Sequence, residues 1–314
     1  MTEENEDKKI SEIAEKALEE CIGLKEEEQV LVITDESRQE IGEAFYRASG
    51  EKTWERYLLK VKEQEQGELK APELAEHLMK KSPDVIIIPT RNSYTHMKAR
   101  EKATEKGARV ATLPGITKET FRRTIDIDYK GMRKEAEKLT EKMKKAERVK
   151  IETNSGTNLT LKIPNEIGKD LGRMKNPGEY GNLPSGEIYT APEEANGKLV
   201  IDSMQEIAKP KTTVYIQNGE TREVEGDREF KKKLWKYKNG RKIAEFGIGM
   251  NPKATITSNT LEDEKVKGTC HIAFGKNIDF GGDIDSDIHW DAILFQPTLK
   301  LDNKKIMDTG KLLI

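Results

Sequence analysis

The chain has 314 residues, of which 36% are charged, yet its formal net charge is only −2. Lysines are interspersed with glutamates and aromatic residues make up only 6%, which argues against a nucleic-acid-binding protein. No apolar run approaches the length of a membrane span, and the acidic start MTEENEDKK is not of the signal-peptide type. The two cysteines, Cys21 and Cys270, are widely separated, which favours a reducing compartment, so we expect a cytoplasmic protein. The length of the chain predicts two domains.

The first half alternates short apolar strands with amphipathic helices, and its clearest buried strand reads DVIIIP. The sequence predicts strands at Val30–Thr34, Trp54–Val61, Asp84–Pro89 and Ala108–Thr112, and helices at Ile10–Cys21, Ser37–Ala48, Ala71–Lys80 and Thr95–Glu105. Such alternation predicts a parallel sheet with helices on both faces, a doubly wound α/β domain over residues 1–128. Neither a G-x-G-x-x-G nor a P-loop motif is present, so we expect no nucleotide in this domain. His77 and His96 lie on charged helices, where we expect solvent-exposed residues.

The second half has a different pattern, which predicts mainly antiparallel strands. A long helix, Tyr129–Arg148, is expected to link the two halves, and Val149–Ile163 reads as a hairpin turning at Asn-Ser-Gly. Further strands are expected at Lys198–Asp202 and Thr213–Ile216, with a charged helix near Arg228–Asn239. We therefore expect residues 129–314 to form an α+β domain. Candidate ligands in its last third further indicate that this domain binds metal.

Two of the four histidines lie in the stretch GTCHIAFGKNIDFGGDIDSDIHWD, residues 268–291. Alternation along two short strands points His271 away from its neighbours and places His289 and Asp291 on one face. A Gly- and Asp-rich loop between the strands can bring these faces together. The simpler interpretation is a core histidine with satisfied hydrogen bonds beside a solvated loop. The combination of H-x-D with a second histidine instead favours a divalent metal such as Zn, Co, Mn or Fe(II).

Two glutamates of the second half stand in unusual surroundings. Glu187 follows the Pro- and Gly-containing segment NLPSG, and Glu245 lies in IAEFGIG, a nearly uncharged run in a highly charged chain. A buried carboxylate must be paired or must bind a cation. Each glutamate alone is more typical of an ion pair, but with His271, His289 and Asp291 they make five candidate ligands. Five such ligands can hold two ions when one carboxylate bridges.

The motifs GNLPSGEIYTAP, AEFGIGMN, GTCHIAFG and IHWD, in this order, resemble the aminopeptidase T (aminopeptidase S) family of metallo-exopeptidases. The resemblance is specific over Asn182–Leu294. The first domain resembles that of the family only in its type of fold. It implies a dinuclear centre of divalent ions (Zn, Co or Mn) in a cytoplasmic homodimer that removes N-terminal residues from short peptides. The implied metal ligands are Glu187, Glu245, His271, His289 and Asp291, with Glu187 and Glu245 as candidate catalytic residues.

The catalytic tyrosine of the larger aminopeptidases is absent after His271, since Lys276–Phe280 reads KNIDF. Tyr180 or Tyr189 could take its place, and Glu193, Glu194 or a ligating glutamate could act as the general base. The 2,5-dihydroxypyridine dioxygenases are similar in fold and in the last motifs. That resemblance implies one Fe(II) held by His271, His289 and Asp291. A third alternative is a metal-stabilised protein without catalysis, in which every coordination position is filled by the protein.

Overall fold

The computed structural model describes residues 3–64, 71–95, 97–205, 207–278 and 281–314. The chain forms two compact units, the first built from Met1–Tyr129 and Gly172–Ser185 and the second from Lys130–Leu171 and Gly186–Ile314. The chain therefore enters the second unit, returns to the first for one short segment, and enters the second again. The sequence predicted a single crossing after residue 128 and did not indicate this return. Among the described helices, none is long and apolar enough to cross a membrane.

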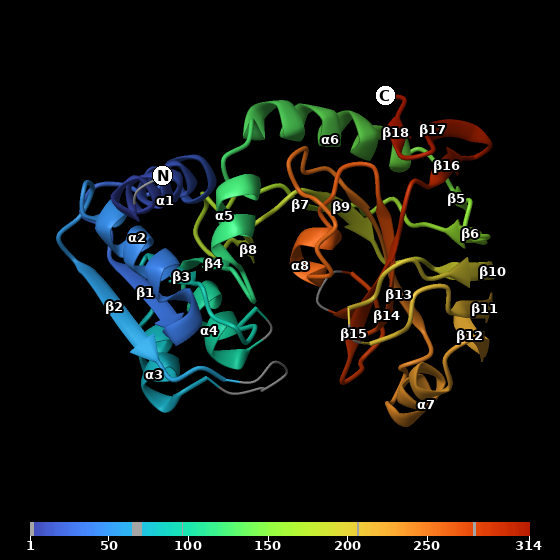
Figure 1. Cartoon of the computed structure of the whole chain (residues 1–314), viewed down its shortest axis with the longest axis horizontal. Helices are drawn as coiled ribbons and strands as arrows, with labels where there is room; N and C mark the ends of the chain where they lie inside the picture. The colour runs from blue at the N-terminus through green and yellow to red at the C-terminus, as the bar shows by residue number, and fades with distance from the viewer. Residues whose placement is uncertain (1–2, 65–70, 96, 206, 279–280) are drawn as a thin grey trace. The chain divides into compact units, whose positions relative to one another are not determined.

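Five parallel strands form the sheet of the first unit, in the order β2-β1-β3-β4-β8 (Figure 1). They are β1 (Val30–Asp35), β2 (Arg56–Val61), β3 (Val85–Ile88), β4 (Arg109–Thr112) and β8 (Tyr180–Asn182). The first four confirm the predicted strands. β8 belongs to the returning segment and was not predicted, because its three residues, YGN, carry no apolar pattern.

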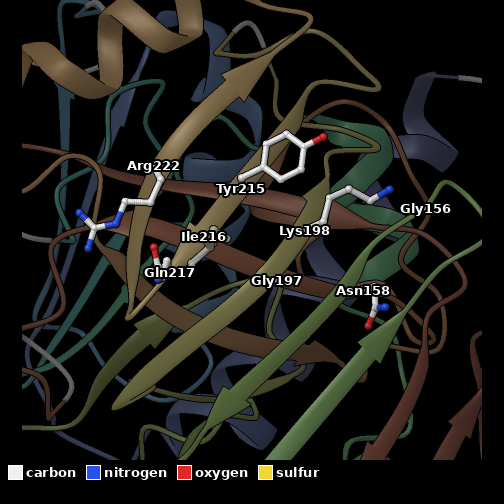
Figure 2. A pocket seen from close by; sticks show the side chains of 8 residues that line it. All are labelled: Gly156, Asn158, Gly197, Lys198, Tyr215, Ile216, Gln217 and Arg222. Carbon is white, nitrogen blue, oxygen red and sulfur yellow. The ribbon is translucent and has the colours of Figure 1, made fainter.

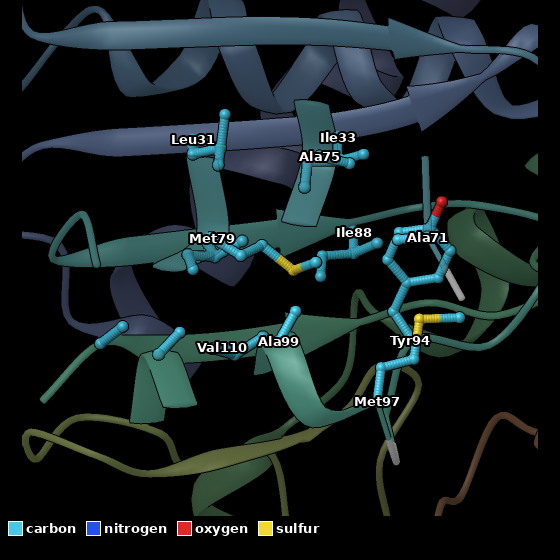
Figure 3. Close-up of a cluster of buried hydrophobic side chains, with 13 residues drawn as sticks. Leu31, Ile33, Ala71, Ala75, Met79, Ile88, Tyr94, Met97, Ala99 and Val110 are labelled. Atoms are coloured by element: carbon cyan, nitrogen blue, oxygen red, sulfur yellow. The ribbon is translucent and has the colours of Figure 1, made fainter. Parts of the chain in front are cut away.

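Helices cover both faces of this sheet, which confirms the predicted doubly wound α/β fold. They are α1 (Glu3–Ala17), α2 (Gln39–Ser49), α3 (Glu73–Lys81), α4 (Lys98–Glu105) and α5 (Lys118–Thr124), with a π-helical turn at Leu18–Ile22 and a 3-10 turn at Glu36–Arg38. On one face, Leu31 and Ile33 of β1 share a hydrophobic cluster with Ala75 and Met79 of α3 (Figure 3). On the other, α2 packs against β1, and its Phe45 ring meets Phe121 of α5 edge to face at 5.6 Å.

Two antiparallel sheets form the framework of the second unit, as the sequence predicted. The larger has eight strands in the order β12-β11-β10-β6-β5-β16-β17-β18. These are β5 (Arg148–Glu152), β6 (Asn158–Lys162), β10 (Glu194–Val200), β11 (Thr213–Gln217), β12 (Glu220–Glu225), β16 (Thr298–Leu301), β17 (Lys304–Asp308) and β18 (Lys311–Leu312). β5 and β6 pair antiparallel, which confirms the hairpin predicted from its Asn-Ser-Gly turn.

The smaller sheet positions the predicted ligands, and its order is β15-β14-β13-β9-β7. Its strands are β7 (Gly168–Asp170), β9 (Glu187–Thr190), β13 (Ile243–Gly249), β14 (Cys270–Gly275) and β15 (His289–Leu294). Every residue of β13 and β14 is buried, so polar side chains on these strands are removed from bulk water. The helices of the unit are α6 (Tyr129–Met143), five residues shorter than predicted, α7 (Arg228–Lys236) and the single turn α8 (Thr260–Asp263).

Candidate metal centre

The five predicted ligands come from four neighbouring strands of the smaller sheet. They are Glu187 in β9, Glu245 in β13, His271 in β14, and His289 and Asp291 in β15. In the antiparallel register, Gly247 is opposite His271, Gly249 is opposite Glu187, and Ala273 is opposite both Glu245 and Asp291. Residues paired across strands, or two apart along one strand, share a face of the sheet. All five side chains therefore project from the same face.

Gly247 makes room for the imidazole of His271. A Cβ atom at this position would lie 2.1 Å from both Cε1 and Nε2 of that ring. The ring therefore lies directly against the backbone of β13, where only glycine leaves enough space. In the sequence this residue belongs to a bare G-x-G, and its function becomes visible only once β13 and β14 are paired.

The donor atoms lie at distances that suit metal binding. Two groups of three side chains could each hold an ion, with all donor atoms of a group within 4.8 Å of one another: Glu187, Glu245 and His271, and Glu245, His289 and Asp291. His271 Nε2 lies 3.3 Å from Glu245 Oε1, and His289 Nε2 lies 3.3 Å from Glu245 Oε2 and 3.4 Å from Asp291 Oδ1. Two ligands of a tetrahedral ion with bonds near 2.0 Å are roughly 3.3 Å apart. The observed spacing therefore fits ligands of a shared ion.

Hydrogen bonding fixes the orientation of His289. Its Nδ1 lies 2.7 Å from the carbonyl oxygen of Lys276 and donates to it, so Nε2 faces the carboxylates of Glu245 and Asp291. A neutral ring would point its Nε2 lone pair at two carboxylates, an arrangement that needs a proton or a metal ion between them. Burial lowers the pKa of His289, but the Asp291 and Glu245 carboxylates outweigh it and raise that pKa well above its ordinary value.

The same competition governs His271 and its carboxylate partners. Burial lowers the pKa of His271, but the hydrogen bond to Glu245 and the charge of Glu187 raise it to about 9. Burial raises the pKa of Glu245, but hydrogen bonds from both imidazoles hold it well below its ordinary value. Among the described residues, the buried atoms Glu187 Oε2 and His271 Nδ1 have no hydrogen-bond partner. The Glu187 Oε2 atom has no hydrogen bond and lies 3.6 Å from His271 Nε2, so a cation bound between the two would satisfy it.

A buried lysine that the sequence did not single out lies beside Glu187. The side chain of Lys265 is 1% exposed, and its ammonium bonds Glu187 Oε1 and lies 2.7 Å from Glu264 Oε1 and 3.7 Å from Asp170 Oδ2. Burial lowers the pKa of Lys265, but Glu187 and Glu264 raise it well above its ordinary value, so the group is an ammonium ion. In the sequence it belongs to EDEKVKG, which looks like a solvated surface run. Nothing local distinguishes this lysine from the others.

The other two glutamates considered as general bases are engaged in the larger sheet. The Glu193 carboxylate pairs with Lys162 at 2.6 Å, and Glu194 Oε1 accepts a hydrogen bond from the Asn196 amide at 2.7 Å. Both glutamates lie next to β6 rather than on the ligand-bearing face of the smaller sheet. These partners favour a glutamate of the cluster over Glu193 and Glu194 as the general base.

The two tyrosines considered in place of the aminopeptidases' catalytic tyrosine are in different units. Tyr180 lies in β8 of the first unit, where the Arg100 guanidinium stacks 3.8 Å from the centre of its ring. Tyr189 lies two residues after Glu187 in β9 and so shares its face of the smaller sheet. Of the remaining histidines, His77 is exposed on α3, as expected, and His96 lies outside the described residues.

A separate hollow of about 700 Å³ lies on the larger sheet (Figure 2). Lys198, Tyr215 and Arg222 line it. Tyr215 Oη donates to Glu225, and Arg222 pairs with Glu220 at 2.8 Å. Two of its polar groups thus already have partners, and none of the five predicted ligands lines it. The hollow is therefore separate from the candidate metal centre.

The comparison with known families covers both units of the chain. A model of the family NicX, 2,5-dihydroxypyridine 5,6-dioxygenase, matches residues 9–314. The chain belongs to this family. No curated protein matches its sequence.

Two solved structures have the same fold as this member of the NicX family. The 2,5-dihydroxypyridine dioxygenase from Pseudomonas putida KT2440 superposes with a TM-score of 0.81 at 17% identity, over 98% of this chain and 97% of that chain. Wild-type AmpT from Thermus thermophilus gives a TM-score of 0.69 at 14% identity, over 98% of this chain and 99% of that chain. At 17% and 14% identity, these two likenesses show a shared fold. The resemblance to the aminopeptidases holds at that level, and the family match favours the dioxygenases.

Proposed function

We propose that this protein is a dioxygenase that uses one Fe(II) ion and O₂ to open a dihydroxylated, nitrogen-containing aromatic ring. The match to the NicX family over residues 9–314 supports this function. The observation that carries it is the set His271, His289 and Asp291, two imidazoles and one carboxylate on the same face of one sheet. Non-haem Fe(II) oxygenases use such a set because it leaves coordination positions open. Iron held there would supply O₂ activation next to the bound ring.

The chain's own groups have distinct tasks in this proposal. The Lys276 carbonyl keeps a proton of His289 on Nδ1, so that Nε2, which faces Glu245 and Asp291, is the nitrogen that would bind the ion. Glu245 touches both imidazoles and holds them on either side of its carboxylate. Glu187 presents its unpaired Oε2 towards the cluster, while Lys265 holds its other oxygen. Burial raises the pKa of Glu187, so its carboxylate is a stronger base than usual and can accept a proton from a ring hydroxyl.

Oxygen uptake tests this proposal. The metal-free protein is loaded with Fe(II) under anaerobic conditions, mixed with 2,5-dihydroxypyridine, and exposed to O₂ in an oxygen electrode. We expect one O₂ consumed per ring opened, seen as loss of the aromatic absorbance. His289→Ala should abolish uptake, whereas Lys267→Met, a surface change outside the cluster, should leave it unchanged. Absence of uptake with this and other dihydroxylated N-heteroaromatic rings would contradict the proposal.

A second candidate is the dinuclear aminopeptidase. The observation that favours it is that the two potential metal-binding groups share Glu245, as two ions bridged by one carboxylate would require. In that case amino-acid amides and dipeptides would be hydrolysed after loading with Zn(II), Co(II) or Mn(II), without O₂. Hydrolysis that survives under argon and disappears in Glu245→Ala would establish this candidate in place of the dioxygenase.

A further inference from the structure

The two groups of candidate ligands that share Glu245 have different electrostatic surroundings. On one side, the Lys265 ammonium bonds Glu187 Oε1, so one oxygen of this ligand already has a cation as its partner. On the other side, no lysine or arginine in the described part of the chain pairs with Asp291, whose ion-pair partner is His289 at 3.4 Å. The side chain of His289 is 28% exposed, whereas that of His271 is 1% exposed. The His289 side is therefore more open and, within the part of the chain that the structure describes, has no lysine or arginine partner at Asp291.

We propose that Lys265 serves as a built-in cation for Glu187, so that the two sides of the cluster bind divalent ions unequally. A first ion binds tightly on the side of His289 and Asp291 and takes His271 as its third ligand, as in the proposed function. A second ion, left with Glu187 and Glu245, binds only weakly. This proposal deepens the proposed function, because unequal sides would give a one-metal enzyme.

The physical reason is repulsion between like charges in a buried site. An ion on Glu187 Oε2 would lie one carboxylate away from the Lys265 ammonium, which is itself fully buried and poorly screened by salt. The position of the ammonium is fixed, because it also forms ion pairs with Glu264 and Asp170. A divalent ion arriving at Glu187 therefore meets a fixed positive charge, whereas one arriving at Asp291 does not.

Titration of the metal-free protein with Mn(II), following the electron paramagnetic resonance signal of the free ion, tests the proposal. Wild type should show one tight class of site per chain and a second class about a hundredfold weaker. Lys265→Met removes the charge but keeps an unbranched side chain, and it should tighten the second class about tenfold or more. Lys265→Arg should behave like wild type. Lys267→Met removes a lysine that pairs with Glu135 on the surface, and it should change neither class.

A second variant keeps the test decisive if Lys265→Met does not fold. Glu187→Gln should eliminate the weak class and leave the tight class within about twofold, whereas Asp291→Asn should eliminate the tight class. Two equal classes in wild type would overturn the proposal, as would an unchanged or weakened second class in Lys265→Met. If Mn(II) binding is unequal but no ring is opened, the proposed dioxygenase activity is wrong and the unequal binding stands.

Discussion

At the scale of single residues, the candidate centre holds two imidazoles between three carboxylates. Without a metal, protons occupy the imidazoles, because Glu245, Glu187 and Asp291 stabilise the charged rings. A divalent ion needs the same nitrogen lone pairs and the same carboxylate oxygens. Protons and metal ions therefore compete for one set of atoms, and pH controls the outcome.

We expect metal affinity to rise with pH up to about 9, the pKa to which Glu245 and Glu187 raise His271 against the effect of burial. Below that pH a proton must leave the ring before Nε2 can bind an ion, and each displaced proton adds about a tenfold gain in affinity per pH unit. Calorimetric titrations with Mn(II) between pH 6 and pH 9 would measure the slope. In His271→Gln, one proton fewer should be released for each ion bound, so the slope of log affinity against pH should decrease by one. A pH-independent affinity would contradict the assignment of His271.

Stability of the metal-free protein should change with pH in the opposite direction. The pKa of His271 is raised from 6.5 to about 9 on folding, despite the opposing effect of burial. Its contribution to stability is therefore fully present below about pH 6.5 and is lost as pH rises through about 9. Urea denaturation of wild type and His271→Gln across this range would isolate the contribution. A wild type that gains stability relative to the variant as pH rises would show that His271 is neutral in the metal-free fold.

At the scale of elements, the sequence predicted strands better than it predicted the contacts between them. Period-two alternation placed His289 and Asp291 on one face, and the register of β14 and β15 agrees. The same rule could not find Lys265, because a lysine in a charged run looks solvated until α8 and β9 are brought together. Nor could it find β8, whose three residues carry no apolar signal. Both depend on long-range packing, which local periodicity does not encode.

Gly247 on β13 tests whether one strand positions a ligand of the neighbouring strand, because this glycine leaves space for the His271 ring. Gly247→Ala places a methyl group 2.1 Å from the His271 ring, so the ring must move. We expect metal affinity to fall about ten- to a hundredfold, as for other changes that misorient a ligand. Ile248→Val is the matched control, because it alters the opposite face of β13 and should lower stability by about 1 kcal/mol without changing affinity. Equal metal binding in Gly247→Ala and wild type would show that His271 is not a ligand.

At the scale of the whole molecule, the five candidate ligands belong to one compact unit although the chain has two. Residues 172–185 interrupt the second unit between β7 and β9, so Glu187 follows a segment that belongs to the first. The composition change near residue 149 indicated two halves of different architecture. It could not reveal the interruption, because a Pro- and Gly-containing segment such as NLPSG indicates a loop but not the unit to which that loop belongs. The metal centre is therefore expected to affect the two units differently.

We expect a bound divalent ion to stabilise the second unit selectively. At a free ion concentration one hundred times the dissociation constant, binding to the folded state alone adds about 2.7 kcal/mol, which slows exchange through unfolding about a hundredfold. Hydrogen-exchange mass spectrometry with and without Mn(II) should show this added protection in β9, β13, β14 and β15 but not in β1 and β3 of the first unit. Asp291→Asn is the control and should show no added protection at either place. Equal protection in both units of wild type would mean that the chain unfolds as one cooperative structure, because a ligand confined to an independently unfolding unit cannot protect the other.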